Sequence, residues 1–136
     1  MNVIVDTSVW SLALRRGAPS ESEVVRELRN LIKEGRVRML GPIRQEILSG
    51  VREETQFRRL RKRLEAFPDL PLLADDYVTA AEFFNRCRVK GVQGSNTDFL
   101  LCAAAARSQS AIFTADKDFV LFAKHLPIIL HQPQSL

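Results

Sequence analysis

The sequence predicts an α/β fold built around a parallel sheet. Residues 3–5 form a short, continuous run of β-branched apolar side chains, which is typical of a strand buried on both faces. A second apolar run at residues 111–114 has the same form, and both runs lead into carboxylates that precede a predicted helix. Strand, helix and strand within the first forty residues indicate a right-handed parallel crossover.

The length and composition are those of one globular domain. The chain has 136 residues, enough to bury a sizeable core, and we expect a single domain over residues 1–136. Its hydrophobic content of 46% and charged content of 26% are ordinary for a soluble protein. No segment approaches the roughly 18 apolar residues of a membrane span, and the N-terminus has no signal-peptide pattern. Cys87 and Cys102 are far apart, which favours a reduced, cytoplasmic protein in which both are small buried hydrophobes.

Two helices and a second strand follow the first strand. The sequence predicts a helix over residues 9–14. Ser20 and Glu23 then match a capping box, in which each side chain bonds to the other residue's backbone N–H, for a helix that ends at Gly35. We expect the second strand at residues 37–40.

The next helix begins at Gly41 and places a carboxylate among apolar side chains. Four positions share one face of this helix by their spacing: Ile43, Glu46, Ile47 and Gly50. Glu46 is therefore predicted on the inward face, where a carboxylate lowers stability unless it is paired, hydrogen-bonded or bound to a metal. An ion pair with Arg44 or Arg52 is the structural alternative.

A polar helix over residues 53–67 carries most of a basic cluster. The cluster comprises Arg52, Arg58, Arg59, Arg61, Lys62 and Arg63. A solvated helix face is the ordinary outcome for such a cluster, and contact with RNA or a protein partner is the alternative. The formal net charge of +4 favours a polyanionic partner. Salt-sensitive binding would be the signature of that contact.

The C-terminal half repeats the alternation of helices and strands. Asp75 and Asp76 are predicted to cap a helix that runs to about residue 90. Residues 95–106 are apolar nearly all round, which predicts a central, buried helix with Asp98 in its first turn. Three further elements are expected: a strand at 111–114, a helix at 120–124 and a strand at 128–130.

Four carboxylates occupy positions at which the predicted elements face a crevice. Asp6 and Asp116 follow strands, Asp98 opens a helix and Glu46 lies on an inward face; ligands of α/β sheets bind at the carboxyl ends of the strands. Carboxylates that share a pocket raise one another's pKa values, so such a cluster is stable in the ionised form chiefly around a hard divalent cation. Mg²⁺ or Mn²⁺ suits ligands that are all oxygen. A cation that activates water, opposite a phosphodiester held by a basic surface, is the chemistry of a metal-dependent nuclease.

Each carboxylate also has a structural alternative. Asp6 and Asp116 could cap the helices that follow them, and Asp98 could interact with the dipole of its own helix. Four separate structural roles in one chain are less expected than one shared site.

The motifs, in this order, resemble those of PIN-domain ribonucleases, and especially those of the VapC toxins of bacterial and archaeal toxin–antitoxin pairs. The resemblance covers nearly the whole chain. It rests on Val5-Asp6-Thr7-Ser8, on Glu46, on Asp98 with the apolar run after it, and on Thr114-Ala115-Asp116-Lys117-Asp118-Phe119. The last of these motifs is the most specific.

The resemblance implies a three-layer α/β/α PIN-like fold with a central parallel sheet of four to five strands. It also implies an endoribonuclease that depends on Mg²⁺ or Mn²⁺ and hydrolyses RNA. The expected partners are a second copy of the chain, forming a homodimer, and a cognate VapB-type antitoxin whose peptide segment occupies the groove and inhibits the enzyme.

The resemblance also assigns roles to individual residues. The acidic metal-binding quartet corresponds to Asp6, Glu46, Asp98 and Asp116. Ser8 and Thr114 match hydroxyl positions that orient the carboxylates, and Asp118 matches a frequent extra acidic position. The chain departs from the family pattern at Asn96 and Thr97, where an additional acidic residue is common, which affects an outer metal contact rather than the quartet.

Two other functions fit parts of the pattern. A catalytically silent PIN fold that binds RNA or protein is the main alternative, and the intact quartet argues against it. A phospho-receiver-like switch also gathers acids at strand ends, but it needs an acceptor aspartate at the end of a middle strand. Residues 37–40 lead instead into Gly41 and Pro42, so this function is the least favoured.

Overall fold

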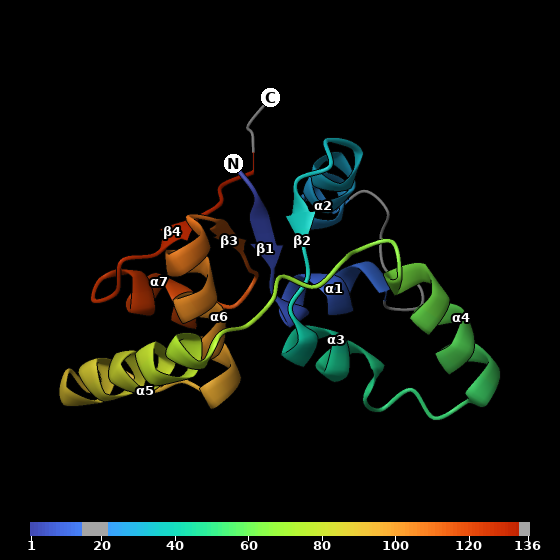
Figure 1. Ribbon diagram of the computed structural model, residues 1–136. Helices are drawn as coiled ribbons and strands as arrows, with labels where there is room; N and C mark the ends of the chain where they lie inside the picture. Colours follow the sequence, from blue (N-terminus) through green and yellow to red (C-terminus); the bar gives the residue numbers. More distant parts are fainter. Residues whose placement is uncertain (15–21, 134–136) are drawn as a thin grey trace.

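Four short parallel strands lie at the centre of the structure (Figure 1). The computed structural model describes residues 1–14 and 22–133. Within this part of the chain the strand order is β2-β1-β3-β4, and every neighbouring pair is parallel. The bounds are Val3–Val5 for β1, Val37–Arg38 for β2, Ala111–Phe113 for β3 and Ile129–Leu130 for β4. The predicted parallel sheet is confirmed.

Helices flank this sheet, with α5, α6 and α7 to the left of β1 in Figure 1 and α2, α3 and α4 to its right. Their bounds are Thr7–Leu14 for α1, Glu23–Lys33 for α2, Gly41–Leu48 for α3, Glu54–Leu64 for α4, Ala74–Val89 for α5, Asn96–Ser108 for α6 and Asp118–Ala123 for α7. Every residue of β1 and β3 is buried, so both faces of the inner strands are covered, as an α/β/α arrangement requires. None of the helices in the described part of the chain is long and apolar enough to cross a bilayer.

The inner strands β1 and β3 end side by side. Their register pairs Val3 with Ala111 and Val5 with Phe113. The backbone N–H of Asp6 continues the pairing and donates to the carbonyl of Phe113 at 2.9 Å. The segments that follow the two strands therefore meet at one edge of the sheet, although they are more than a hundred residues apart in the chain.

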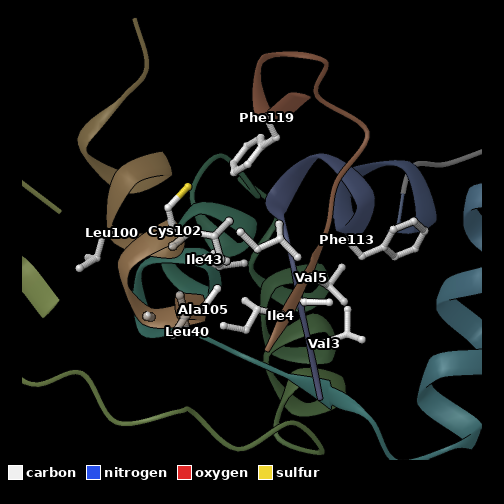
Figure 2. Close-up of a cluster of buried hydrophobic side chains, with 14 of the residues drawn as sticks. Val3, Ile4, Val5, Leu40, Ile43, Leu100, Cys102, Ala105, Phe113 and Phe119 are labelled. Atoms are coloured by element: carbon white, nitrogen blue, oxygen red, sulfur yellow. The ribbon is translucent and has the colours of Figure 1, made fainter. Parts of the chain in front are cut away.

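One hydrophobic cluster fills the space between the sheet and the helices (Figure 2). Figure 2 shows the side chains of β1 together with Ile43 of α3 and Phe113 of β3. Residues 99–105 of α6 are all buried, which confirms the prediction of a central helix. Cys87 and Cys102 are free and buried, as predicted.

Most boundaries differ from the prediction by one to three residues, and two of these differences have a visible structural reason. The second strand is only two residues long, because Met39 leaves it and forms an isolated parallel bridge with Asp69. The N-cap of α2 is Ser22, whose Oγ accepts from the N–H of Val25 at 3.5 Å. Ser20 of the predicted capping box lies outside the described residues.

A buried carboxylate connects α5 to α6. Asp76, in the first turn of α5, accepts from the N–H of Leu73 at 2.8 Å. Arg107 of α6 donates its Nε to Asp76 Oδ1 at 2.7 Å and its Nη2 to Oδ2 at 3.0 Å. Asp76 thus caps its own helix, as predicted, and also forms an ion pair with the helix packed against it.

Candidate functional site

Three aspartates gather at the carboxyl edge of the sheet. Asp6 directly follows β1, Asp116 follows β3, and Asp98 lies in the first turn of α6. Burial raises the pKa of Asp98 above its ordinary value, and the negative charges of Asp6 and Asp116 raise it further. The fold therefore places three of the four predicted acids within range of one another's charge.

Two hydroxyls hold the carboxylate of Asp6. Ser8 Oγ donates to Asp6 Oδ2 at 2.7 Å, and Thr114 Oγ1 donates to the same oxygen at 2.8 Å. Each hydroxyl also accepts a backbone N–H at 3.0 Å, from Ala115 to Ser8 and from Asp116 to Thr114. These bonds join the segments after β1 and β3. Within residues 1–14 and 22–133, the second oxygen, Asp6 Oδ1, accepts no hydrogen bond, which leaves it free for a ligand.

Asp98 has a capping role as well as a place in the acidic group. Its Oδ2 accepts from the N–H of Ser95 at 3.0 Å, and Ser95 Oγ accepts from the N–H of Asp98 at 3.0 Å. This is a reciprocal capping box, and it fixes the orientation of the carboxylate. Asp98 therefore does have a structural role at the start of its own helix. That role uses only Oδ2 and leaves Oδ1 of Asp98 available.

Asp116 and Asp118 differ in their surroundings. Asp116 is half-buried, and its Oδ1 accepts from the N–H of Asp118 at 2.9 Å. Asp118 is exposed at the first residue of α7, so its carboxylate lies at the outer part of this edge.

Glu46 is exposed, which corrects the expectation that it lies on the inward face of its helix. Helix α3 ends before Gly50, and Glu46 lies about 100° around the helix from the buried Ile47, at the border of the apolar stripe. Its Oε1 accepts from Thr7 Oγ1 at 2.8 Å, and Thr7 is the residue next to Asp6. The fourth acid therefore lies at the exposed side of the acidic group. Arg44, an alternative partner for Glu46, pairs instead with Asp69 at 2.8 Å.

Two residues of the site were not singled out from the sequence as members of it. Thr7 orients Glu46, and Ser95 orients Asp98. Ser95 had a detectable signal, because a serine three residues before an acidic residue is the pattern of a capping box. The Thr7 contact had none, because its partner lies 39 residues further along the chain.

Cys102 lies on α6 one turn after Asp98. Burial raises the pKa of its thiol, and the charges of Asp98, Cys87 and Asp6 raise it further. The thiol is therefore held in its neutral form, which makes it unreactive.

The donor set suits a hard cation that keeps part of its water. The side-chain atoms of this hydrogen-bond network that could coordinate a metal are carboxylate and hydroxyl oxygens, the ligand type of Mg²⁺ and Mn²⁺. In the described part of the chain, no three His, Cys, Asp or Glu side chains are arranged so that they could enclose an ion. Mg²⁺ typically binds one or two carboxylates and retains several waters, so this open arrangement fits it.

A groove with both apolar and basic walls lies beyond the end of α1. It has a volume of about 410 Å³ and is lined by Leu14, Val51, Gln56, Arg59, Leu60 and Arg63. Arg59 and Arg63 are one turn apart on α4, and both are exposed. The basic cluster noted in the sequence therefore presents cationic side chains to solvent along one helix.

Comparisons with known proteins agree on a family. The PIN domain family model matches residues 3–125. Ribonuclease VapC11 of Mycobacterium tuberculosis is 32% identical over 126 residues, which cover 90% of this chain and 92% of that protein. A VapC ribonuclease of Mycobacterium bovis matches with the same identity and coverage.

Solved structures share the fold at lower sequence identity. The crystal structure of FitAcB from Neisseria gonorrhoeae superposes with a TM-score of 0.77 at 22% identity, covering 98% of this chain and 99% of that one. VapBC2 from Rickettsia felis, bound to a DNA fragment from its promoter, superposes with a TM-score of 0.76 at 18% identity, covering 96% and 98%. These likenesses extend over nearly the whole of each chain.

Proposed function

The chain belongs to the PIN domain family, and from this premise we propose that it is an endoribonuclease, the toxin of a VapBC-type toxin–antitoxin pair. Its relatives at 32% identity are named ribonucleases and are matched over nine tenths of their length. The observation that carries the proposal is the convergence of Asp6, Asp98 and Asp116 at one edge of the sheet.

One or two of Asp6, Asp98 and Asp116 would bind a divalent cation directly and the others through its waters, with Glu46 completing the quartet from the exposed side. A bound Mg²⁺ or Mn²⁺ would supply an activated water and neutralise charge on the phosphodiester. Burial is the main cause of the raised pKa of Asp98, and a bound cation would offset the smaller contribution of the negative charges of Asp6 and Asp116.

The chain's own hydrogen bonds prepare this site. Ser8 and Thr114 hold Asp6 Oδ2, so Asp6 Oδ1 could bind a ligand without a change in the side-chain conformation. Thr7 holds Glu46 in the same way, and Asp118 extends the acidic edge through its N–H bond to Asp116. Residues whose rotamers are locked by such bonds keep a site at productive geometry.

Two protein partners follow from the proposal. A VapB-type antitoxin would place a peptide segment in the groove of about 410 Å³, where the apolar walls accept apolar side chains and Arg59 and Arg63 accept acidic ones. The other partner would be a second copy of the chain, which would form a homodimer. We place this activity in the cytoplasm.

A catalytically silent module that binds RNA or protein is the second candidate. It is favoured by one observation: among residues 1–14 and 22–133, no three metal-ligating side chains are arranged to enclose an ion. Tight RNA binding without cleavage in the presence of metal would identify it.

The test is RNA cleavage by purified protein in Mn²⁺, Mg²⁺ and EDTA, with the RNA ends sequenced. We expect cleavage with either metal and none in EDTA. Asp6→Asn and Asp116→Asn should remove cleavage and retain the wild-type circular dichroism spectrum. Asp75→Asn, an exposed carboxylate on α5, is the matched control and should cleave as wild type. Full activity in EDTA or in Asp6→Asn protein would contradict the proposal.

A further inference from the structure

A second pocket lies at the N-terminus of α6, beside the acidic site. It has a volume of about 280 Å³ and is lined by Phe84, Arg88, Val92, Gln93, Gly94 and Phe99. Gly94 is bonded to Ser95, whose N–H lies 3.0 Å from Asp98 Oδ2. The wall of the pocket therefore comes within roughly 4 Å of a carboxylate of the acidic site.

Aromatic rings form the inner surface of this pocket. Phe84 is half-buried and meets the buried Phe99 edge to face, with ring centroids 5.5 Å apart. Phe99 in turn packs against Phe122 of α7, with ring centroids 4.9 Å apart. A Cβ at Gly94 would lie 2.5 Å from the Phe122 ring, so only glycine lets the loop approach these rings this closely.

The loop that forms the other wall is pre-formed. Helix α5 ends in a Schellman motif, with Gly91 at φ 75°, the Val92 N–H bonded to the Cys87 carbonyl at 2.9 Å and the Gly91 N–H bonded to the Arg88 carbonyl at 2.9 Å. Beyond this motif, the backbone N–H groups of Gln93 and Gly94 donate to no other group in the described part of the chain. The loop therefore has a fixed shape, and two of its backbone donors are used by no described protein group.

Arg88 is the one charged residue among those that line the pocket. Arg86 and Lys90 are near it in the sequence, and the carboxylates of Glu82 and Asp98 flank residues 83–97. Arg88 is exposed and forms no ion pair with another described residue. Its guanidinium is thus available for a ligand.

We propose that this pocket binds one unpaired base of the RNA substrate, close to the phosphodiester that is cleaved. A nucleobase has apolar faces that stack on aromatic rings and a polar edge that bonds to arginine or glutamine, and the pocket is lined by the half-buried Phe84 ring, Arg88 and Gln93. A lone phosphate would use Arg88 but not the rings, and an aliphatic side chain of a partner protein would leave Arg88 and Gln93 without a role.

This inference rests on the proposed function and adds residues that would determine its specificity. The pocket would take a base only from an unpaired stretch, because a base within a duplex cannot turn into it. The inference also predicts a base preference at one fixed distance from the cut, read by Phe84 and Arg88.

The test measures binding of short, fluorescently labelled single-stranded RNAs in EDTA, so that nothing is cleaved. The probes are the four homopolymers and an oligomer of the same backbone without bases. The proteins are wild type, Phe84→Leu, Arg88→Gln and the control Arg86→Gln. Arg86→Gln removes one positive charge from the same helix as Arg88→Gln does. Arg86, however, lies over the Phe83 ring and does not line the pocket. Thermal melts of each protein verify folding, and the exposed Arg88 can change without loss of packing.

Wild type should prefer at least one homopolymer over the base-free oligomer. Phe84→Leu and Arg88→Gln should reduce that preference by roughly 5- to 150-fold, as for loss of one stacked base. Arg86→Gln should weaken all the probes, including the base-free one, by the same salt-dependent factor. The inference is overturned if wild type shows no preference for bases. It is also overturned if Phe84→Leu and Arg88→Gln keep the base preference of wild type, as the control Arg86→Gln should. In either case the pocket would accept a side chain of a protein partner.

Cleavage in Mn²⁺, measured in parallel, separates this inference from the proposed function. Cleavage by wild type with unaltered base preference in Phe84→Leu and Arg88→Gln overturns the pocket and leaves the nuclease intact. Loss of base preference in both variants, with no cleavage by wild type, supports the pocket and overturns the nuclease.

Discussion

Asp98 and Asp76 occupy corresponding positions in α6 and α5, yet their electrostatic surroundings are opposite. Each lies in the first turn of its helix and accepts from the backbone N–H of the capping residue, Ser95 at 3.0 Å and Leu73 at 2.8 Å. The hydrogen bonds of Arg107 lower the pKa of Asp76. Burial, with the charges of Asp6 and Asp116, raises the pKa of Asp98.

The difference separates a carboxylate that the fold uses from one that we propose to bind a ligand. Asp76 is 2% exposed and fully paired, so its charge is already used by the fold. Asp98 is held in place with no cation beside it in the described part of the chain, so its charge is available to a ligand. A helix-capping carboxylate can therefore belong to a site, and the neighbouring charges decide whether it does.

The largest expected effect is on catalysis. Asp98→Asn should lower the rate of RNA cleavage by about 10³-fold or more, because it removes a charged ligand from the proposed cation site. Asp76→Asn should leave the rate per folded molecule unchanged. Single-turnover cleavage assays at 25 °C compare the two variants, and equal losses in both would remove the distinction between them.

The same pair should respond in the opposite order when stability is measured. Asp76→Asn should lower the free energy of unfolding by about 2–3 kcal/mol, since it leaves Arg107 without its charged partner. Asp98→Asn should lose less or gain stability at neutral pH without metal, because it relieves repulsion from Asp6 and Asp116. Urea unfolding measures both, with the exposed Asp75→Asn as a control expected within about 0.5 kcal/mol of wild type.

The residues that orient Asp6 provide a smaller effect that sharpens the comparison. Ser8→Ala and Thr114→Val each remove one of the two hydroxyl donors to Asp6 Oδ2. Each should lower activity or metal affinity by roughly 10- to 100-fold, the usual effect of losing a group that orients a metal ligand. Ser11→Ala on the exposed side of α1 should have no effect. Metal titrations of cleavage rate distinguish lost affinity from lost turnover.

The smallest expected effects are those of pH on stability. Asp76 has a lowered pKa, so its contribution is present above its ordinary pKa of 3.8 and is lost as pH falls through the lower folded value. Asp98 has a raised pKa, so its ionisation opposes folding at neutral pH, and this opposition disappears as pH falls through the raised value towards 3.8. In metal-free urea titrations, the free energy of unfolding of Asp98→Asn relative to wild type should therefore change between neutral pH and about pH 4. The corresponding difference for Asp76→Asn should change only below about pH 4.

The positions of three members of the candidate site could be predicted because they follow short local patterns. Asp6 and Asp116 come after buried apolar runs, and Asp98 opens a helix whose apolar character is visible all round. The exposure of Glu46 could not be predicted in this way. Its spacing from Ile43 and Ile47 placed it at the border of the stripe, and only the length and packing of α3 decided on which side of that border it lies.

By itself, the sequence determined the strands, the central helix α6 and the order of the acidic residues along the chain, because hydrophobic periodicity acts over a few neighbouring residues. The tertiary structure alone decided which charges meet. Arg107 reaches Asp76 from 31 residues away, Thr7 reaches Glu46 from 39, and Thr114 reaches Asp6 from 108. Such contacts depend on how whole elements pack, and for that reason the opposite pKa shifts of two similarly placed aspartates could not be predicted from local sequence.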